Sequence, residues 1–400
     1  MKKVFVLVAL FFIQFALAQS DDERTGGSFT PTSFYQVVPF VFENNQIKIP
    51  VTIEGEIFTF LFDTGAPLAI SKTIQQKYNY KELYVADLSD ANGKKDTVTI
   101  VKVPEIKLGD ITFYNTEGLK MEEDASEFFK CLGIDGIFGA NMLVGKIVQL
   151  DMQNKHLIFT TDITKLHASD IPYKSLEFDD QNSPFVDVTL KNGANEIAES
   201  VIFDTGVASF FDLAIAQYQW YEKYYPMASV FAETFGALSW SYTGFEDPNK
   251  QYIYKIPELS INGTAFTNVL SVGTYDRASR LGLGILDYGT VTLDYVNKRF
   301  YYTPLPDLFV FKNQLLQAFD NTITKNGLFV SAIWNKELED KINIGDQVLA
   351  YNNISYQNKT MCELINFKHV TQKKNNVIRF KDVKTGKVKK VKIAQFYLNE

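Results

Sequence analysis

The run Phe60-Leu61-Phe62-Asp63-Thr64-Gly65 decides how this chain is interpreted, and a second copy, Ser200-Val201-Ile202-Phe203-Asp204-Thr205-Gly206, follows it. In each copy an apolar, β-prone segment ends in an aspartate and a Thr-Gly turn. The apolar segment predicts a buried strand, and the glycine allows a tight turn and the close approach of another backbone. A carboxylate at the end of a buried strand is costly unless it has a partner. The two copies therefore predict that Asp63 and Asp204 are each other's partners.

A single Asp-Thr-Gly would be weak evidence, because Asp and Gly also fill their usual roles in ordinary turns. Here a longer pattern repeats around it, and residues 47–160 share an ordered series of features with residues 185–303. Each stretch has a strand with a Gly-containing turn, the Asp-Thr-Gly strand, a later hairpin, an apolar segment ending in Gly and a final β-hairpin. An ordered repeat of this kind predicts two homologous lobes.

Length and composition indicate a multi-domain, β-rich globular protein. A chain of 400 residues exceeds one ordinary core, so two or three domains are expected. Phe and Tyr are abundant, strand-like runs recur, and Asn92-Gly93 predicts a hairpin turn. The net charge of −7 gives no electrostatic footprint for nucleic acid. Only the segment Lys373–Lys392 is basic, and it is interpreted as a solvated strand pair around Thr385-Gly386.

The first 18 residues have the pattern of a signal peptide. Lys2 and Lys3 precede an apolar run, and Ala16-Leu17-Ala18 offers small residues for cleavage. The apolar run is too short for a membrane span, and no later run is long and uncharged enough for one. We therefore expect residues 1–18 to be a signal peptide and the mature protein to be exported, periplasmic or extracellular.

The cysteines and histidines give no sign of a disulfide scaffold or a metal site. Cys131 and Cys362 are too few for such a scaffold and are expected in different domains, so two free, mostly buried thiols are predicted. The three histidines, His156, His167 and His369, lack metal-ligand spacing. No metal and no cofactor is predicted.

On these motifs the chain resembles an aspartic protease of the pepsin and retropepsin type, in a bilobal bacterial form, over about residues 30–303. The resemblance implies an all-β fold with a bilobal pair of aspartic-protease-like β-barrels, lobe 1 at 19–165 and lobe 2 at 166–303. It implies an aspartic endopeptidase that acts on peptide or protein substrates through a water held by a carboxylate pair. The implied site is catalytic Asp63 and Asp204, with dyad support from Thr64, Gly65, Thr205 and Gly206.

The family also has a later hydrophobic-hydrophobic-Gly element that passes near the motif. In lobe 1 this element is Ile137-Phe138-Gly139. In lobe 2 it is either Ile285-Leu286 after Gly284, or Gly282-Leu283-Gly284 itself, and both readings stay open. The hairpin around Asn92-Gly93 is equally suited to be a flap over the cleft or an ordinary surface hairpin, and it has no Tyr at its tip.

Two departures from the family pattern lie directly after the motifs. Pro67 follows Ala66 where Ser is frequent, and Val207 stands where the family usually has Ser, Thr or Ala. Val207 cannot donate a hydrogen bond to an ionised carboxylate, so the pKa values of the dyad are expected to be higher than in Ser-flanked relatives. Activity should then lie nearer to neutral than to strongly acidic pH. The alternative is a catalytically silent peptide-binding protein on the same fold.

The sequence changes character after Pro304-Leu305-Pro306, which suggests a domain at 304–400. Phe309–Phe319 has apolar residues at helical spacing. The Gly345-Asp346-Gln347-Val348-Leu349 turn makes this region resemble a PDZ domain of the bacterial protease-associated kind. Such domains bind a peptide terminus by strand addition, and Gly327, Leu328, Phe329 and Val330 are the predicted peptide-binding segment. The alternative is a packing module without a ligand.

Overall fold

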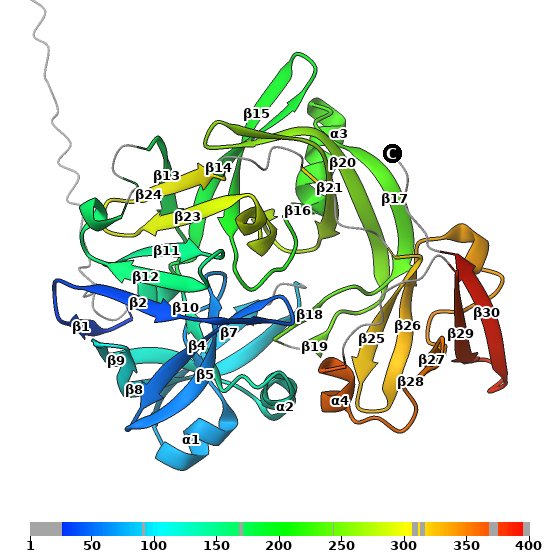
Figure 1. Ribbon diagram of the computed structural model, residues 1–400, viewed down its shortest axis with the longest axis horizontal. Helices are drawn as coiled ribbons and strands as arrows, with labels where there is room; N and C mark the ends of the chain where they lie inside the picture. The colour runs from blue at the N-terminus through cyan, green and yellow to red at the C-terminus, as the bar shows by residue number, and fades with distance from the viewer. Residues whose placement is uncertain are drawn as a thin grey trace, which may run out of the picture.

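The computed structural model describes residues 26–89, 93–166, 168, 171–242, 244–305, 311–312, 317–367 and 375–394. The predicted signal peptide, residues 1–18, lies outside this part of the chain. Strands dominate the described residues, as the composition predicted (Figure 1). None of the helices within these ranges is long and apolar enough to cross a membrane.

Six strands between residues 46 and 139 pair in a closed ring, here called the first ring. In ring order they are β4 (Gln46–Ile53), β5 (Glu56–Asp63), β10 (Gly136–Gly139), β6 (Ala69–Ile70), β9 (Ile111–Lys120) and β8 (Lys95–Leu108). Alternate residues of β4 are buried from Ile47 to Ile53, as expected of a strand that lays one face on a core. Strand β10 is parallel to β5 and places Gly139 opposite Asp63.

Further elements extend the first ring. They are β1 (Ser28–Thr30), β3 (Val41–Glu43), α1 (Lys72–Tyr78), β7 (Lys81–Ser89), α2 (Glu123–Cys131) and the 3-10 turn η2 (Ala140–Leu143). Another 3-10 turn, η3 (Ile163–Lys165), comes later in the chain. The hydroxyl of Ser71 caps α1 by accepting from the Ile74 amide at 3.3 Å. Strands β7 and β8 form the hairpin that Asn92-Gly93 predicted, although Asn92 itself lies outside the described residues.

Six later strands repeat this arrangement in a second ring. In the same ring order they are β14 (Pro184–Asn192), β15 (Asn195–Phe203), β22 (Arg280–Leu281), β16 (Phe211–Ala214), β21 (Thr264–Thr274) and β20 (Asn249–Ile261). Leu281 lies opposite Phe203 as Phe138 lies opposite Phe62. The later Gly element of this half is therefore Arg280-Leu281-Gly282, which starts before both of the readings that the sequence left open.

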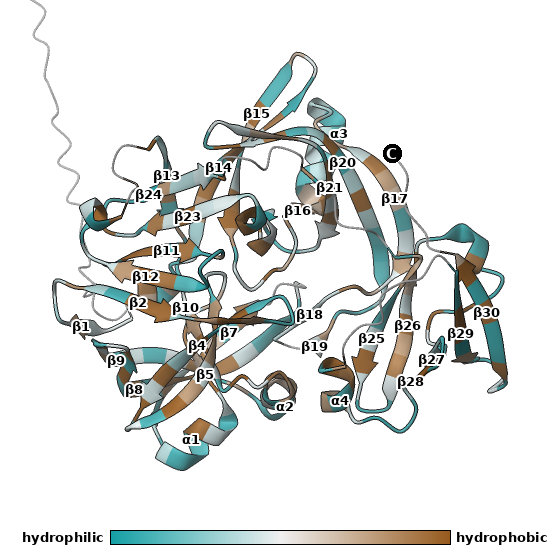
Figure 2. Cartoon of the chain, in the orientation of Figure 1, coloured by the Kyte–Doolittle hydropathy of each residue, from teal (hydrophilic) through white to brown (hydrophobic). Residues whose placement is uncertain are grey.

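A six-stranded sheet joins the two rings. Its order is β2 (Tyr35–Pro39), β12 (His156–Thr160), β11 (Ile147–Asp151), β23 (Gly289–Asp294), β24 (Arg299–Pro304) and β13 (Tyr173–Phe178). Two of its pairs, β11–β12 and β23–β24, are the final hairpins predicted for the repeat. One apolar cluster includes Phe62, Phe138, Phe203 and Leu281, so the rings share a core beneath the motifs. Figure 2 shows apolar residues recurring along these strands.

Residues 317–394 form a C-terminal module with a core of its own. Its elements are β25 (Phe319–Thr324), β26 (Gly327–Ile333), η5 (Lys336–Leu338), β27 (Gln347–Tyr351), β28 (Ile354–Ser355), α4 (Met361–Ile365), β29 (Asn375–Lys381) and β30 (Val388–Ala394). Its core contains Val330, Val348, Ile378 and Phe380. Strands β29 and β30 confirm the strand pair predicted in the basic tail. The predicted helical pattern, Phe309–Phe319, ends on a residue that begins a strand, and its residues 309–310 and 313–316 lie outside the described part.

A disulfide connects the C-terminal module to the first ring, and the prediction of two free thiols was wrong. Cys131 at the end of α2 is bonded to Cys362 in α4. The amide of Asn366 also donates to the Cys131 carbonyl at 2.8 Å. The prediction assumed that cysteines of different domains lie apart. They meet here because α2 of the first ring packs against α4 of the module. The closed loop spans 231 residues of sequence.

The module also contacts the second ring through a strand edge. β17 (Ser229–Gly236), an additional strand of that ring, places Gly236 opposite Ala332 of β26. The Ala237 amide donates to Ser331 O at 3.1 Å, and the Thr234 hydroxyl donates to Ile333 O at 2.7 Å. The C-terminal module is therefore attached to both rings (Figure 1).

Candidate active site

The two motif turns meet between the rings and are braced by their threonines. The Thr64 amide donates to Thr205 Oγ1 at 3.0 Å, and the Thr205 amide donates to Thr64 Oγ1 at 3.1 Å. Each hydroxyl then donates to the main chain of the opposite motif strand, Thr64 to Phe203 O at 2.5 Å and Thr205 to Phe62 O at 2.9 Å. Both threonines are completely buried. This reciprocal set holds the two strand ends in one position relative to each other.

The glycines of the motifs let the two carboxylates lie side by side. Gly65 N donates to Asp63 Oδ1 at 2.9 Å, and Gly206 N donates to Asp204 Oδ1 at 2.8 Å. A Cβ atom on Gly65 would lie 2.6 Å from the Asp204 carboxylate, and one on Gly206 would lie 2.6 Å from that of Asp63. Each carboxylate therefore sits over the opposite glycine. The structure brings together all six residues predicted for the dyad and its support.

The surroundings of this pair favour a shared proton. Burial, followed by repulsion from the Asp204 carboxylate, raises the pKa of Asp63 well above its usual range. The Gly65 amide and, more distantly, the Arg280 guanidinium act in the opposite direction. Adjacent carboxylates in a shielded site cannot both ionise cheaply, so the pair titrates as a unit. Such a pair offers a base and an acid to the same water molecule.

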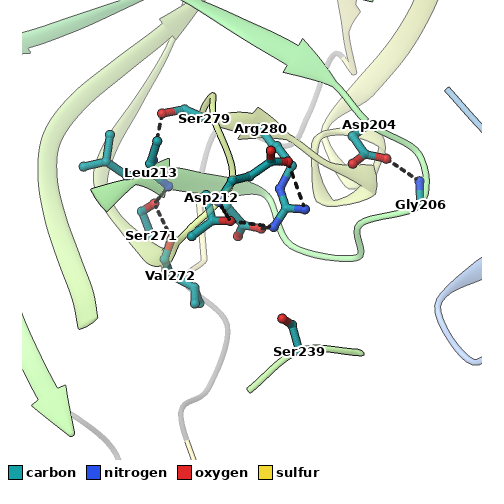
Figure 3. A network of polar contacts seen from close by, with 12 residues as sticks. Asp204, Gly206, Asp212, Leu213, Ser239, Ser271, Val272, Ser279 and Arg280 are labelled. Atoms are coloured by element: carbon teal, nitrogen blue, oxygen red, sulfur yellow. Dashed lines mark hydrogen bonds and ion pairs between the residues drawn. The ribbon is translucent and has the colours of Figure 1, made fainter. Parts of the chain in front are cut away.

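Arg280 is the charged residue near the dyad that the sequence reasoning missed. It is buried on β22, where Nη2 donates to Asp212 Oδ2 at 3.2 Å and to Thr274 Oγ1 at 3.1 Å (Figure 3). Its Nη1 lies 3.8 Å from Asp276. The internal repeat could have indicated Arg280, because Arg280 occupies the position in the second ring that Ile137 occupies in the first ring. Both segments proposed for the later Gly element begin after Arg280 and therefore left it out.

A hairpin from the second ring crosses to the first ring. It consists of β18 (Trp240–Ser241) and β19 (Gly244–Phe245), which follow β17. The Trp240 ring stacks on Phe128 of α2 with 3.5 Å between centroids, and the Tyr242 hydroxyl donates to Lys120 O at 3.0 Å. Near the end of the β7–β8 hairpin, Lys94 Nζ donates to Phe245 O at 2.9 Å. Hairpins of both rings therefore meet, a contact that the sequence did not predict.

A cavity of about 280 Å³ lies beside the first motif. Pro67, which follows the Asp-Thr-Gly-Ala turn, lines it together with Ala86 and Val98 of the β7–β8 hairpin and Leu119 of β9. The segment 180–182 of the second ring lines its other side. The β7–β8 hairpin, predicted as either a flap or a surface hairpin, thus forms one wall of a cavity next to the motif.

The predicted peptide-binding segment of the C-terminal module lies on β26. Strand β26 pairs with β25 from Gly327 to Ile333. A cavity of about 260 Å³ lies between β25 and α4, lined among others by Asn321, Ile323, Leu328 and Leu364. Of the four predicted residues, Leu328 lines this cavity, while Gly327, Phe329 and Val330 do not.

Two aspartates held carboxylate beside carboxylate on threonine-braced turns are the apparatus of an aspartic peptidase. The family model described as Aspartyl protease matches residues 49–142, which supports this class of enzyme. The matched segment contains Asp63, the β7–β8 hairpin and β10, and it ends before the second motif. No curated protein matches the chain.

Proposed function

We propose that the chain is an exported aspartic endopeptidase in which the two rings are the barrels of a bilobal enzyme, lobe 1 at 19–165 and lobe 2 at 166–303. The substrate peptide lies between the rings, across Asp63 and Asp204. One observation carries the proposal, namely the exchange of hydrogen bonds between Thr64 and Thr205. It gives the second motif, beyond the matched family segment, the same geometric role as the first.

The reaction follows from a dyad that holds one proton. The ionised carboxylate accepts a proton from the bound water as the water oxygen attacks the carbonyl carbon of the peptide. The protonated carboxyl donates its proton to the carbonyl oxygen, which gives a neutral tetrahedral diol. In the second step a carboxylate accepts a proton from one hydroxyl of the diol, the C–N bond breaks, and the amine leaves with a proton from the dyad. The dyad returns to its starting state with one proton.

Export is supported by two separate features of the chain. Residues 1–18 have the pattern of a cleavable signal peptide. The Cys131–Cys362 disulfide is of the kind that forms and persists in oxidising compartments such as the periplasm or the extracellular space. Both features favour a location outside the cytosol.

The C-terminal module is proposed to be a PDZ-like domain that docks a peptide terminus. Its cavity between β25 and α4 is lined by both apolar and polar side chains, including Ile323 and Asn321. A peptide in this cavity would contact a strand and a helix of the module, consistent with docking as an added strand. Binding of a fluorescent peptide library to the full chain tests this, and an Ile323→Asp variant should lose the binding if the cavity is the site.

The test of the endopeptidase is digestion of a peptide library by the mature full chain between pH 3 and pH 8, with cleavage sites read by mass spectrometry. The unaltered protein should cut internal peptide bonds, and Asp204→Asn should cut none. Near-UV circular dichroism confirms that the variant is folded. Equal cleavage by Asp204→Asn would overturn the proposal, because the second motif would then have no part in the reaction.

A further inference from the structure

The two rings carry matching rows of side chains beside the dyad, and the rows differ in polarity. In the first ring, Leu61, Ile137 and Ala69 lie opposite one another on β5, β10 and β6. All three belong to an apolar cluster that also includes residues of the β7–β8 hairpin. The face of the first ring beside the dyad is therefore apolar.

The corresponding row of the second ring contains an ion pair. Ile202, Arg280 and Asp212 lie opposite one another on β15, β22 and β16. Arg280 takes the place of Ile137, and Asp212 takes the place of Ala69. Figure 3 shows both charged side chains on strands next to Asp204. The face of the second ring is therefore polar at the register positions where the first ring is apolar.

The Asp212–Arg280 ion pair contributes little to the stability of the fold. Arg280 Nε is buried without a hydrogen-bond partner among the described residues, and beyond Arg280 the Asp212 carboxylate has the Ser209 hydroxyl as a side-chain partner. A buried ion pair repays the cost of removing it from water only when its remaining polar atoms are also satisfied. The first ring builds the same row from apolar side chains, so the fold does not need the charges. Their presence points to a role in contacting a ligand.

The pair lines a small cavity that faces the crossing hairpin. The cavity, of about 60 Å³, is lined by Asp212, Arg280 and Val272 on the ring side and by Ser239 and Glu246 on the hairpin side. It is therefore enclosed between the sheet that carries Asp204 and a hairpin, as the apolar cluster of the first ring is enclosed by the β7–β8 hairpin.

Carboxylates outnumber cations around this cavity. The cavity is lined by the carboxylates of Asp212 and Glu246 and by one cation, Arg280, whose Nη1 also lies 3.8 Å from Asp276. A wall with excess negative charge selects a positively charged group.

On the basis of the peptidase function proposed above, we infer that the Asp212–Arg280 pair makes the second-ring side of the cleft a subsite for a lysine or arginine side chain, while the first-ring side takes an apolar one. The aliphatic stem of the substrate residue packs along Ile202 and Val272. Its cationic head donates charge-assisted hydrogen bonds to the carboxylates around Arg280. The substrates are therefore peptides with an apolar residue on one side of the cleaved bond and a basic residue on the other.

A peptide series that differs in one residue next to the cleaved bond tests this inference. The full chain should cleave the Lys and Arg peptides with a kcat/KM at least about tenfold above that of the Leu peptide, and the Glu peptide more slowly still. The double variant Asp212→Ala/Arg280→Ile, which copies the apolar row of the first ring, should prefer Leu. Replacing a buried ion pair by apolar residues is often tolerated, so this variant is expected to fold.

Lys191→Met is the matched control, because Lys191 pairs with Glu196 on the β14–β15 hairpin, outside the cavity lining. It should keep the preference of the unaltered protein. A preference of the unaltered protein for Leu or Glu, or an unchanged preference in the double variant, overturns the inference.

Affinity measurements distinguish a failure of the subsite inference from a failure of the peptidase proposal. The folded Asp204→Asn variant should bind the Lys peptide more tightly than the Leu peptide by fluorescence anisotropy. If the protein cleaves peptides but does not prefer a basic residue, the subsite inference is wrong and the peptidase proposal stands. Absence of cleavage defeats the peptidase proposal, and the same peptides bound to Asp204→Asn then decide the inference.

Discussion

Thr64 and Thr205 each donate an amide hydrogen bond to the hydroxyl of the other, at 3.0 and 3.1 Å, so neither motif turn can move without the other. Both side chains are fully buried, and a lost hydroxyl leaves the opposite amide without its partner. An unsatisfied buried group costs about 1–3 kcal/mol. The geometry of the dyad therefore depends on these two hydroxyls.

Thr205→Val is expected to lower both kcat/KM and the free energy of unfolding, because it removes an acceptor from the Thr64 amide and a donor from Phe62 O. Thr205→Ser keeps the hydroxyl and should lose much less of either quantity. Peptide cleavage and guanidinium unfolding measure the two effects. Equal activity of the Val and Ser variants would show that the brace does not position the dyad.

Gly65→Ala and Gly206→Ala should each abolish cleavage. The new methyl group would lie 2.6 Å from the opposite carboxylate, a distance that forces the carboxylate to move. Gly193→Asn is the control, because nothing lies within 4 Å of a Cβ atom there and Asn tolerates its positive φ of 61°. Cleavage rates near those of the unaltered protein in either motif variant would contradict the side-by-side arrangement.

The pH profile of cleavage should extend toward neutrality. The dyad is active with one proton, so activity falls at high pH as that proton is lost and at low pH as a second one is bound. Burial and Asp204 raise the pKa of Asp63, which moves the alkaline limb upward. Val207 has no side-chain donor that would stabilise an ionised carboxylate and so move the alkaline limb back to lower pH. A maximum below about pH 4 would contradict this prediction.

Arg280→Met should move the alkaline limb of the same profile to higher pH. The Arg280 guanidinium lowers the pKa of Asp63, so its removal makes the shared proton harder to lose. Arg277→Met is the control, since Arg277 is paired with Asp179 and is not among the groups that shift Asp63. If the alkaline limb of Arg280→Met stays at the same pH or moves to lower pH, the Arg280 guanidinium does not act on the dyad.

The Cys131–Cys362 disulfide should stabilise the attachment of the C-terminal module rather than the dyad. The double variant Cys131→Ser/Cys362→Ser is expected to lose about 2–5 kcal/mol of unfolding free energy. Its kcat on a short peptide should stay near that of the unaltered protein, because neither cysteine contacts the motifs. Unfolding in denaturant under oxidising and reducing conditions measures the loss, and an unchanged midpoint would contradict it.

The sequence predicted the features that depend on local pattern. Asp63 and Asp204 were found because each ends an apolar strand, and the β7–β8 and β29–β30 hairpins because turn residues separate two strand-like runs. Features that depend on contact between distant segments were missed. Arg280 lies outside both segments proposed for the later Gly element, and only the parallel pairing of β22 with β15 gives it the place of Ile137.

The pairing of Cys131 with Cys362 shows the same limit. It depends on how α2 packs against α4, and no spacing in one sequence reports that packing. The stacking of Trp240 on Phe128 depends in the same way on a hairpin of one ring reaching the other. Local pattern thus located the motifs, while the arrangement of whole elements determined what surrounds them.

The central claim is that Asp63 and Asp204 act as one proton-sharing pair, and the pH dependence of kcat/KM in Asp63→Asn and Asp204→Asn tests it most directly. Both variants should remain folded and should lose at least about a thousandfold in kcat/KM at every pH, because either amide leaves the pair without its base or its acid. A variant of either aspartate that keeps a bell-shaped profile and substantial activity would contradict the claim.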